Sequence, residues 1–516
     1  MVMRVTMGMR EETVTSREMA AIELNAEYLG VPSVRLMENA GGAVASEVAL
    51  RFRVEETSVT IFAGTGGKGG DGMVAARHLA DRGFRVKLAL FGQPEQIRRE
   101  AVKQNWETLQ LMADSVSVSV IDDSLLIPAV EGEVVVDALL GTGFRGELQP
   151  PISQAVAAIN AASGFRVAID LPTGVDPDTG SVLSKAVKAN LTVTFHRPKT
   201  GLSKASELTG EVVVAPIGVP PEAENLLGPG DVLLATKQRP RETHKGDYGR
   251  ILVIGGSEQY HGAPTLAAMA AMRTGIDLAY VAVPETIAHD VAAVSPALIV
   301  VKLEGSNLSV KNMDQLKPWL SRCTAVVLGP GLGLLPETAE AVKGIVEVVE
   351  GRGLPLLLDA DGLKAFSSFK RPLKCPLVLT PHAGEYEILT GEKLPGTLTE
   401  KVRHVEGTAR ALRAVLLVKG AVDIVSDGSR TKLNRFAHNP GMTVGGTGDV
   451  LSGIVGALLS QGFDAFRAAA AGTFINGAAG DFAYRERGYH LLPDDLFDWI
   501  PKVMNSPMDH VSVRHL

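Results

Sequence analysis

The amino-acid sequence predicts an α/β protein of two domains, each with a parallel sheet between layers of helices. Short runs of β-branched and other apolar residues recur along the chain, and each is followed by glycine, proline or aspartate. An alanine-rich stretch with helical spacing usually comes next, which is typical of parallel sheets covered by helices. The length of 516 residues, 45% of them hydrophobic, exceeds one ordinary core and therefore predicts more than one domain.

The ends of the predicted strands are where we expect the functional residues. Glycine, aspartate and threonine cluster there, and open parallel sheets bind their ligands beyond the carboxyl ends of the strands. The predicted strands are SVTIFAG (58–64), VVVDALLG (134–141), FRVAIDLP (165–172), ILVIGG (251–256), AVVLGPG (325–331) and LPLLLDAD (354–361).

The domain boundary is predicted close to Leu226. Between residues 221 and 245 the strand and helix rhythm gives way to proline, glycine and charge, in PEAENLLGPGD and KQRPRETHKGD. This division gives domains 1–226 and 227–516. Their glycine motifs differ in spacing, so the halves are expected to do separate jobs rather than to be duplicates.

Composition excludes several classes of partner. The 51 basic and 58 acidic residues give a net charge of -7, which disfavours a general nucleic-acid surface but not a local phosphate pocket. Cys323 and Cys375 are too few for a disulfide scaffold or a paired-cysteine metal site. The opening MVMRVTMGMR lacks an apolar segment, and no apolar run reaches membrane-spanning length. We expect a cytoplasmic homo-oligomer that acts on small molecules, without membrane or nucleic acid.

The motif NPGMTVGGTGDVLSG (439–453) is the most specific signal in the chain. Glycines 445, 446 and 448 let backbone N–H groups converge on an anion, and the positive end of the following helix points there. Asp449 falls in the first turn of that helix, where a carboxylate could take a proton from a hydroxyl that attacks a held phosphate. The alternative is that Asp449 only caps the helix.

With its companions, this motif resembles the ADP- or ATP-dependent NAD(P)H-hydrate dehydratases, which are ribokinase-like. HKGDYGRILVIGGSEQYHGAP (244–264), GPGLG (329–333), LDADGL (358–363), TPHAGE (380–385) and VKG (418–420) occur in the family's order. The resemblance implies that the hydrated nicotinamide nucleotide contacts Ala263, Gly333, His382 and Asp449. It also implies that ADP or ATP is bound by Lys419, Gly420, Ala421, Val422, Asp423 and Gly448.

The implied chemistry is phosphorylation of the C6 hydroxyl of the hydrated nicotinamide ring, followed by loss of phosphate. Phosphate leaves well where hydroxide does not, so the protein mainly has to align the hydroxyl, the phosphoryl group and a base. Asp359 and Asp361 end an apolar strand and could organise Mg²⁺ through water, because magnesium prefers oxygen ligands. A turn and helix cap is an equally good interpretation of this pair, and His382 and Lys419 could be an ordinary loop histidine and a solvated lysine.

In the first half, GTGGKGGDG (64–72) follows a strand and precedes the helical MVAARHLADRG. A lone glycine-rich loop fits many phosphate sites and some tight turns. LMENAGGAVA (36–45), VDALLGTGFRGEL (136–148), IDLPTGVDPDTG (169–180) and FHRPKTGL (195–202) make residues 15–220 similar to the NAD(P)H-hydrate epimerases, which implies a Rossmann-like domain. The resemblance implies that the hydrated dinucleotide, abbreviated NAD(P)HX, is bound by Gly67, Lys68, Gly69, Gly70, Asp71, Gly141, Thr142, Gly143, Phe144, Arg145, Gly146, Glu147 and Asp170.

Asp137 is our candidate acid/base for the interconversion of the R and S hydrates, because it ends a strand beside these loops. Helix capping is the alternative for Asp137 and for Asp170. The resemblance associates Asp137 and Thr173 with a bound potassium ion. However, Gly67 and Lys68 stand where the family has two asparagines, the second of them a potassium ligand. We hypothesise that the Lys68 ammonium replaces K⁺ as counter-charge for Asp137.

Three functions remain open from the sequence. The first is a repair enzyme whose epimerase half supplies the S hydrate to the dehydratase half. The second is a ribokinase-like kinase for a small molecule, and the third gives the first half only a nucleotide-binding or interaction role. Lys199 could contact a pyrophosphate or be a solvated lysine.

Overall fold

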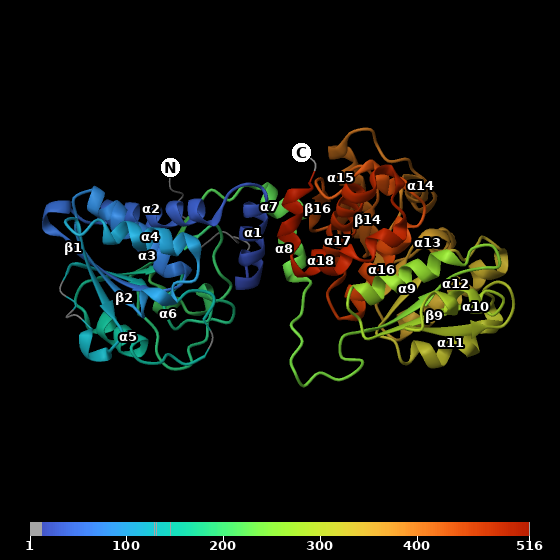
Figure 1. Ribbon diagram of the computed structural model, residues 1–516, viewed down its shortest axis with the longest axis horizontal. Coiled ribbons are helices and arrows are strands. Elements are labelled where there is room, and N and C mark those ends of the chain that lie inside the picture. Colours follow the sequence, from blue (N-terminus) through green and yellow to red (C-terminus); the bar gives the residue numbers. More distant parts are fainter. Residues whose placement is uncertain (1–12, 128–129, 131, 145, 515–516) are drawn as a thin grey trace. The chain divides into compact units, whose positions relative to one another are not determined.

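The computed structural model describes residues 13–127, 130, 132–144 and 146–514 (Figure 1). Arg145 and the opening segment 1–10 therefore lie outside the described residues. The chain divides into two compact units, Met1–Pro220 and Pro221–Leu516. The Leu227 backbone N–H donates to the Leu433 carbonyl at 2.9 Å, so the segment around the expected boundary belongs with the second unit.

The first unit contains a seven-stranded sheet whose strands are all parallel. Its order, β3-β2-β1-β4-β5-β6-β7, reverses direction between β1 and β4, as in Rossmann-like sheets. The strands are β1 (Ser58–Gly64), β2 (Arg85–Phe91), β3 (Val116–Ile121), β4 (Val134–Ala138), β5 (Phe165–Ile169), β6 (Leu191–Phe195) and β7 (Glu211–Ala215). The helices are α1 (Ser16–Tyr28), α2 (Ser33–Arg51), α3 (Gly67–Asp81), α4 (Glu100–Gln110), α5 (Ile152–Ala161) and α6 (Ser206–Thr209).

Helices cover both faces of this sheet because successive strand residues point to opposite sides. Ile61 of β1 faces α3, where a Cβ on Gly72 would lie 3.4 Å from the Ile61 Cγ2. The neighbouring Phe62 packs in the opposite core, with Val156 and Ile159 of α5. Figure 1 shows α3 and α5 on different sides of the sheet. The predicted three-layer arrangement is confirmed for this unit.

The second unit has a nine-stranded sheet in the order β10-β9-β8-β11-β12-β13-β14-β15-β16. Its strands are parallel as far as β14, and β15 and β16 are antiparallel. The strands are β8 (Arg250–Ile254), β9 (Leu278–Pro284), β10 (Leu298–Leu303), β11 (Ala325–Leu328), β12 (Leu356–Leu358), β13 (Leu377–Leu379), β14 (Val415–Val418), β15 (Asp423–Ser426) and β16 (Thr431–Asn434).

Helices again lie on both faces of the sheet in the second unit. Gly456 of α16 packs on Ile251 and Val327, whereas Leu252 points into a core shared with Phe366. The helices are α7 (Glu222–Asn225), α8 (Pro229–Leu234), α9 (Gly262–Arg273), α10 (Ala288–Val294), α11 (Met313–Leu320), α12 (Pro336–Gly351), α13 (Ala360–Ser367), α14 (Ala383–Thr390), α15 (Leu398–Leu412), α16 (Thr447–Ser460), α17 (Ala465–Arg487) and α18 (Trp499–Asn505).

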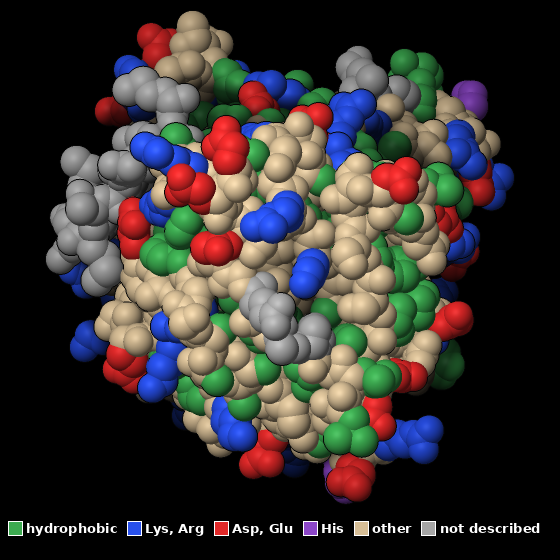
Figure 2. Space-filling view, turned by 90° about the vertical axis from the view of Figure 1, so that its left-hand side faces the viewer, with side chains coloured by type: hydrophobic (Ala, Val, Ile, Leu, Met, Phe, Trp, Pro, Cys, Tyr) green, Lys and Arg blue, Asp and Glu red, His purple; other side chains and the backbone are tan. Residues whose placement is uncertain are grey.

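Each sheet has a switch point where connections leave neighbouring strands toward opposite sides, and ligands of such sheets bind there. In the first unit it lies between β1 and β4, and in the second between β8 and β11. Over the part of the chain that the structure describes, none of the helices has the length and apolar character needed to span a bilayer. On the face seen in Figure 2, basic and acidic side chains are interspersed.

Candidate functional site

The glycine loop of the first unit is packed more tightly than a turn alone requires. A Cβ on Gly69 would lie 1.7 Å from the Gly64 carbonyl oxygen, and one on Gly64 would lie 2.1 Å from the Leu139 carbonyl oxygen. Side chains are therefore excluded at both positions. The sequence placed the helix after residue 72, but α3 begins at Gly67, and the Gly70 N–H bonds the Gly66 carbonyl at 3.1 Å. The glycine run thus forms the first turn of α3 at the switch point.

Lys68, in that first turn, directs its ammonium into a shell of oxygen atoms. Its Nζ lies 3.0 Å from Asp137 Oδ2, 3.1 Å from Thr173 Oγ1, 2.7 Å from the Leu171 carbonyl oxygen and 3.3 Å from that of Leu140. Only 6% of Lys68 and 1% of Asp137 are exposed. Burial lowers the pKa of Lys68, and the charge of Asp137 opposes that shift. The structure brings together all the residues that the sequence associated with potassium.

Asp137 is enclosed rather than open to the candidate site. Its Oδ2 accepts from Lys68 and from the Thr173 N–H at 2.7 Å, and its Oδ1 accepts from the Thr173 hydroxyl at 2.6 Å and the Leu139 N–H at 3.2 Å. Both oxygens are occupied, and Asp137 does not line the neighbouring cavity. This geometry argues against the expected acid/base role of Asp137 and favours a structural one.

A cavity of about 610 Å³ opens at the switch point of the first unit. This volume is within the usual range for small-molecule sites. It brings together both glycine-containing loops and Asp170, but Gly69, Gly70, Gly146 and Glu147 are not among its lining residues. The lining residues that the sequence predicted are Gly67, Lys68, Asp71, Gly141, Thr142, Gly143, Phe144, Asp170 and Lys199.

Two carboxyl groups in this cavity differ in their partners. Asp170 has a left-handed backbone (φ 63°), and its Oδ1 accepts from the Lys199 ammonium at 2.5 Å and the Thr194 hydroxyl at 3.0 Å. Asp71 has no hydrogen-bond partner for its carboxyl group among the described residues. Burial raises the pKa of Asp71 well above its ordinary value, and the charges of Asp170 and Glu23 add to that effect. A carboxyl group with a raised pKa therefore lies near an ion-paired one.

Sequence reasoning missed two charged residues of this cavity. Glu23 comes from α1, and Arg99 is the residue before α4; neither belongs to a recognisable motif. The Arg99 guanidinium lies 2.9 Å from the position that a Cβ on Gly67 would occupy. Lys199, which the sequence left open, is buried and paired with Asp170, so it is not a solvated lysine.

In the second unit, the start of the glycine motif at residues 439–453 is the predicted anion-binding loop, called the anion loop below, and it leads directly into α16. Gly446 is the N-cap residue with φ 104°, and a Cβ there would lie 2.7 Å from Pro493. Gly448 follows in the first turn, and a Cβ on it would lie 3.5 Å from the Lys419 Nζ. The glycines thus leave room for backbone N–H groups and one ammonium to face a common space.

Lys419, which follows β14, is held from several sides. Its Nζ lies 3.0 Å from Asp359 Oδ1 and 3.9 Å from Glu385 Oε2, and Asp359 Oδ2 accepts from the Ser452 hydroxyl at 2.6 Å. Asp359 follows β12, and Glu385 lies in α14 after β13. The carboxyl ends of three adjacent strands therefore converge with α16. Glu385 and Ser452 lay inside recognised motifs, but the sequence gave no reason to single them out.

Asp449 is in the first turn of α16, as predicted, beside this buried charge cluster. Burial raises its pKa from 3.8 to about 7, and repulsion from Asp359 and Asp361 contributes, while the Lys419 ammonium opposes the shift. A carboxylate with a pKa near neutrality is suited to accept a proton in general base catalysis.

The remaining predicted residues of this unit lie around the same strand ends, on loops or at the starts of helices and strands. The His382 Nδ1 accepts from the Gly384 and Glu385 N–H groups at 3.0 and 3.3 Å, so this side chain caps α14. Asp423 Oδ1 accepts from the Gly420 N–H at 3.0 Å. Ala263 lies in the first turn of α9, after β8, and Gly333 lies in the loop after β11; the two segments meet, since a Cβ on Gly331 would lie 3.3 Å from that of Ala263.

The two metals expected from the sequence fit differently. Potassium does not fit at Asp137 and Thr173, because the Lys68 ammonium already lies at hydrogen-bond distance from both. For magnesium, the described residues include no group of three acidic, histidine or cysteine side chains suited to a metal. Both oxygens of Asp359 are engaged. Magnesium fits here as an ion bound mainly by nucleotide phosphates and water, which is its common mode.

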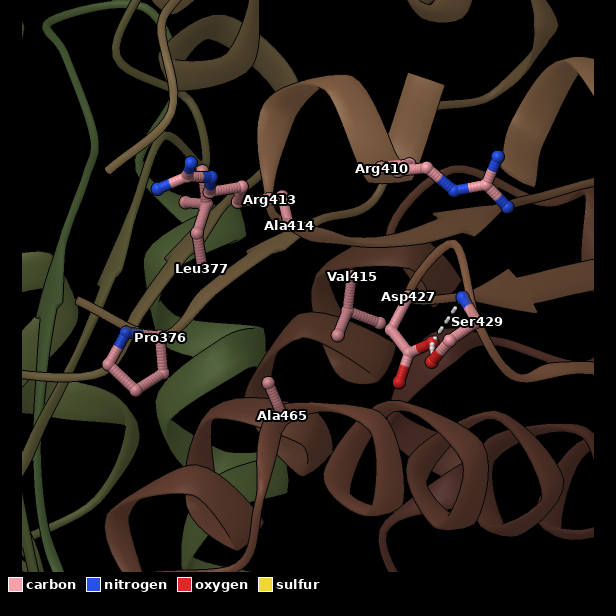
Figure 3. Close-up of a pocket in the computed structure, with 9 residues that line it drawn as sticks. All are labelled: Pro376, Leu377, Arg410, Arg413, Ala414, Val415, Asp427, Ser429 and Ala465. Carbon is pink, nitrogen blue, oxygen red and sulfur yellow. Dashed lines mark hydrogen bonds between the residues drawn. The ribbon is translucent and has the colours of Figure 1, made fainter. Parts of the chain in front are cut away.

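A further cavity of about 470 Å³ lies at the opposite end of the second sheet, by the amino ends of β13 and β14 (Figure 3). Asp427 there accepts from the Ser429 N–H at 2.8 Å, and the guanidinium groups of Arg410 and Arg413 point in opposite directions. These charged groups do not converge on a common point, so this cavity is not the candidate site.

The two sheets and their sites define an α/β enzyme with two separate units. Comparisons with known proteins are consistent with this class. Residues 251–502 match the family model described as NAD(P)H-hydrate dehydratase, and residues 33–201 match the model described as YjeF-related protein N-terminus.

Full-length relatives show the family. A bifunctional NAD(P)H-hydrate repair enzyme of Pyrobaculum aerophilum is 44% identical over 500 residues, which cover 96% of this chain and 98% of the relative. One from Archaeoglobus fulgidus is 43% identical, with coverage of 96% and 98%. The chain belongs to the family of bifunctional NAD(P)H-hydrate repair enzymes.

Solved structures similar to the second unit include a ribokinase-like superfamily protein from Enterococcus faecalis. It is 26% identical, with 55% of this chain and 95% of that chain covered and a TM-score of 0.48. An ADP/ATP-dependent NAD(P)H-hydrate dehydratase from Bacillus subtilis, co-crystallised with ATP and Mg²⁺, is also 26% identical. That match covers 53% of this chain and 96% of that chain, with a TM-score of 0.46.

Proposed function

We propose that this chain repairs hydrated NADH and NADPH in the cytoplasm. The first unit epimerises the R and S hydrates at C6, and the second dehydrates the S hydrate at the expense of ADP or ATP. The observation that carries the proposal is the position of Asp449, whose raised pKa, neighbouring glycine loop and nearby Lys419 suit it to phosphoryl transfer from a nucleotide.

In the dehydratase reaction, Asp449 takes the proton from the C6 hydroxyl as that oxygen attacks the terminal phosphoryl group. Gly448 and Lys419 support the nucleotide phosphates, together with the segment from Lys419 to Asp423. When bound, Mg²⁺ supplies charge neutralisation on the phosphates, and Asp359 and Asp361 would hold it through water. Electron density on the ring nitrogen then expels phosphate as the C6–O bond breaks, and loss of a proton from C5 to the departing phosphate or to water restores the 5,6 double bond.

The hydrated nicotinamide nucleotide is placed among Ala263, Gly333 and His382. The start of α9, which carries Ala263, and the loop that carries Gly333 approach each other at the switch point, where ligands of such sheets bind. His382 would present its outer ring edge, since its Nδ1 is used in capping α14.

For the epimerase reaction, we assign proton transfer to Asp71 and Asp170 in place of Asp137. Both line the cavity, whereas Asp137 does not. Asp71, with its raised pKa, is suited to donate a proton, and Asp170 to accept one. Lys199 and Arg99 add positive charge where a pyrophosphate would lie.

The test uses the full chain with a mixture of R and S NADHX and either ADP or ATP. The expected result is complete recovery of NADH absorbance with release of phosphate and of AMP or ADP. Consumption of only the S hydrate would contradict the epimerase assignment. A stable phosphorylated product would instead indicate a small-molecule kinase. Sedimentation of the same sample tests the expected homo-oligomer.

A further inference from the structure

The first unit contains a cation that is part of the chain. The Lys68 ammonium contacts one carboxylate, one hydroxyl and two backbone carbonyls, at 2.7 to 3.3 Å. These are the oxygen donors that hard metal cations take in proteins. An ammonium carries a single positive charge, and its three N–H donors are shared among these four acceptors.

We propose that Lys68 is a tethered substitute for a monovalent metal ion, so that the epimerase unit works independently of potassium and sodium. This inference rests on the proposed epimerase function for its activity readout only. A free ion cannot share the shell, because it would have to occupy the position of the Nζ against electrostatic repulsion.

The surrounding chain is built to admit the lysine. A Cβ on Gly141 would lie 3.2 Å from the Lys68 Cβ and 3.8 Å from its Cδ, so the absence of a side chain at 141 leaves room for the lysine stem. The start of α3 at Gly67 directs that stem toward the ends of β4 and β5. The Lys68 side chain is therefore held by packing around its stem as well as by the contacts of its ammonium, unlike a flexible surface lysine.

Lys68 also ties together two loops that line the cavity. It bonds the Leu140 carbonyl after β4 and the Leu171 carbonyl after β5. Thr173 strengthens the same link, since its hydroxyl oxygen accepts from the Leu140 N–H at 3.1 Å. Residues 141–144 of the first loop line the cavity. A cation in this position is needed to hold the cavity wall, besides balancing the charge of Asp137.

The experiment compares the full chain and two variants in buffers containing K⁺, Na⁺ or only tetramethylammonium. The wild type is expected to epimerise at the same rate, within about twofold, in all three. Lys68→Asn replaces the ammonium with a short side chain that offers an oxygen. It is expected to lose roughly tenfold or more of its rate without K⁺, because Asp137 then lacks a counter-charge, and to recover with K⁺.

Thermal unfolding supplies a readout that does not require activity. The unfolding midpoint of Lys68→Asn is expected to rise with K⁺ concentration, whereas that of the wild type is not. Lys87→Asn, which changes an exposed lysine of β2, is the matched control and should behave as the wild type.

Strong stimulation or stabilisation of the wild type by K⁺ would overturn the inference, even if Lys68→Asn failed to fold. So would a Lys68→Asn variant with full activity and stability in tetramethylammonium. If the wild type shows no epimerase activity, the proposed function fails, but the unfolding measurements still decide whether Lys68 replaces the ion.

Discussion

Asp449 shows how burial prepares a single residue for its reaction. Because its pKa is raised to about 7, the residue is protonated below neutrality and ionised above it. A base must be ionised to act, so the dehydratase kcat/KM should fall about tenfold per pH unit below about 7. A pH profile with saturating nucleotide checks this. A rate unchanged down to pH 5 would contradict the assignment.

The same residue should limit stability. A carboxyl whose folded-state pKa lies above its unfolded value holds its proton more tightly when folded, so the free energy of unfolding decreases as pH rises from about 4 to about 7. Asp449→Asn removes this cost. The variant should gain about 2 kcal/mol above pH 7, after allowance for solvent screening, and no gain at pH 4. Denaturant unfolding at both pH values measures the difference, and equal effects would contradict it.

At this scale the sequence predicted residue positions better than residue roles. The pairing of Lys68 with Asp137 followed from a substitution within a recognisable loop. The enclosure of Asp137 could not be foreseen, because it depends on Thr173 donating twice to the same carboxylate. Glu23 and Arg99 reach the cavity from elements without any motif, so only the folded chain brings them there.

Among the elements, α17 and the C-terminal segment stabilise the anion loop of the second unit. Asp481 of α17 accepts from the Asn439 side-chain amide at 2.6 Å and contacts His510 Nε2 at 2.8 Å. Asn439 begins the glycine motif, and His510 lies in a 3-10 helix, Pro507–Ser512. Both Asp481 and His510 are almost completely buried. Asp481 and His510 thus hold Asn439, the first residue of the glycine motif, in place.

His510→Phe should destabilise the second unit by about 3–5 kcal/mol, because Asp481 loses its buried partner. It should also raise the KM for ADP or ATP. Without His510 the Asp481 carboxylate is less ordered, and Asn439, which donates to that carboxylate, is then held less firmly. Ser512→Ala, at an exposed position of the same short helix, should change neither quantity. Chemical unfolding and steady-state kinetics test both effects, and an unaltered KM would argue against the anchoring role.

The sequence also located six of the strands but misplaced one helix start. Strand periodicity and the following turn residues located β1, β4, β5, β8, β11 and β12. The beginning of α3 was predicted too late, because a run of glycines normally indicates a loop. Here Gly69, in the first helical turn, lies against the end of β1, and that contact exists only in the assembled sheet.

For the molecule as a whole, two sheets with separate cores carry two separate sites. Asp449→Asn should therefore abolish dehydration and leave interconversion of the hydrates intact. Asp170→Asn should slow epimerisation about 100-fold or more while sparing dehydration of the S hydrate. Chromatography of the R and S hydrates, alongside NADH recovery, separates the two outcomes. Loss of both activities in either variant would contradict independent sites.

At this largest scale the fold class followed from simple alternation, since strands separated by helical stretches permit few arrangements other than parallel sheets. The antiparallel pairing of β15 and β16 was not predicted, because their four-residue runs are short and lack clear periodicity.

The oxygen shell around the Lys68 ammonium has a consequence for the conditions in which the protein can work. A cation that belongs to a side chain of the protein has an effective concentration at its site that dilution cannot reduce. The cation site is therefore occupied in every folded molecule, because no binding equilibrium with free ions is involved. The first unit should therefore keep its working shape in cells whose salt content fluctuates, where an exchangeable metal would leave a fraction of the molecules empty.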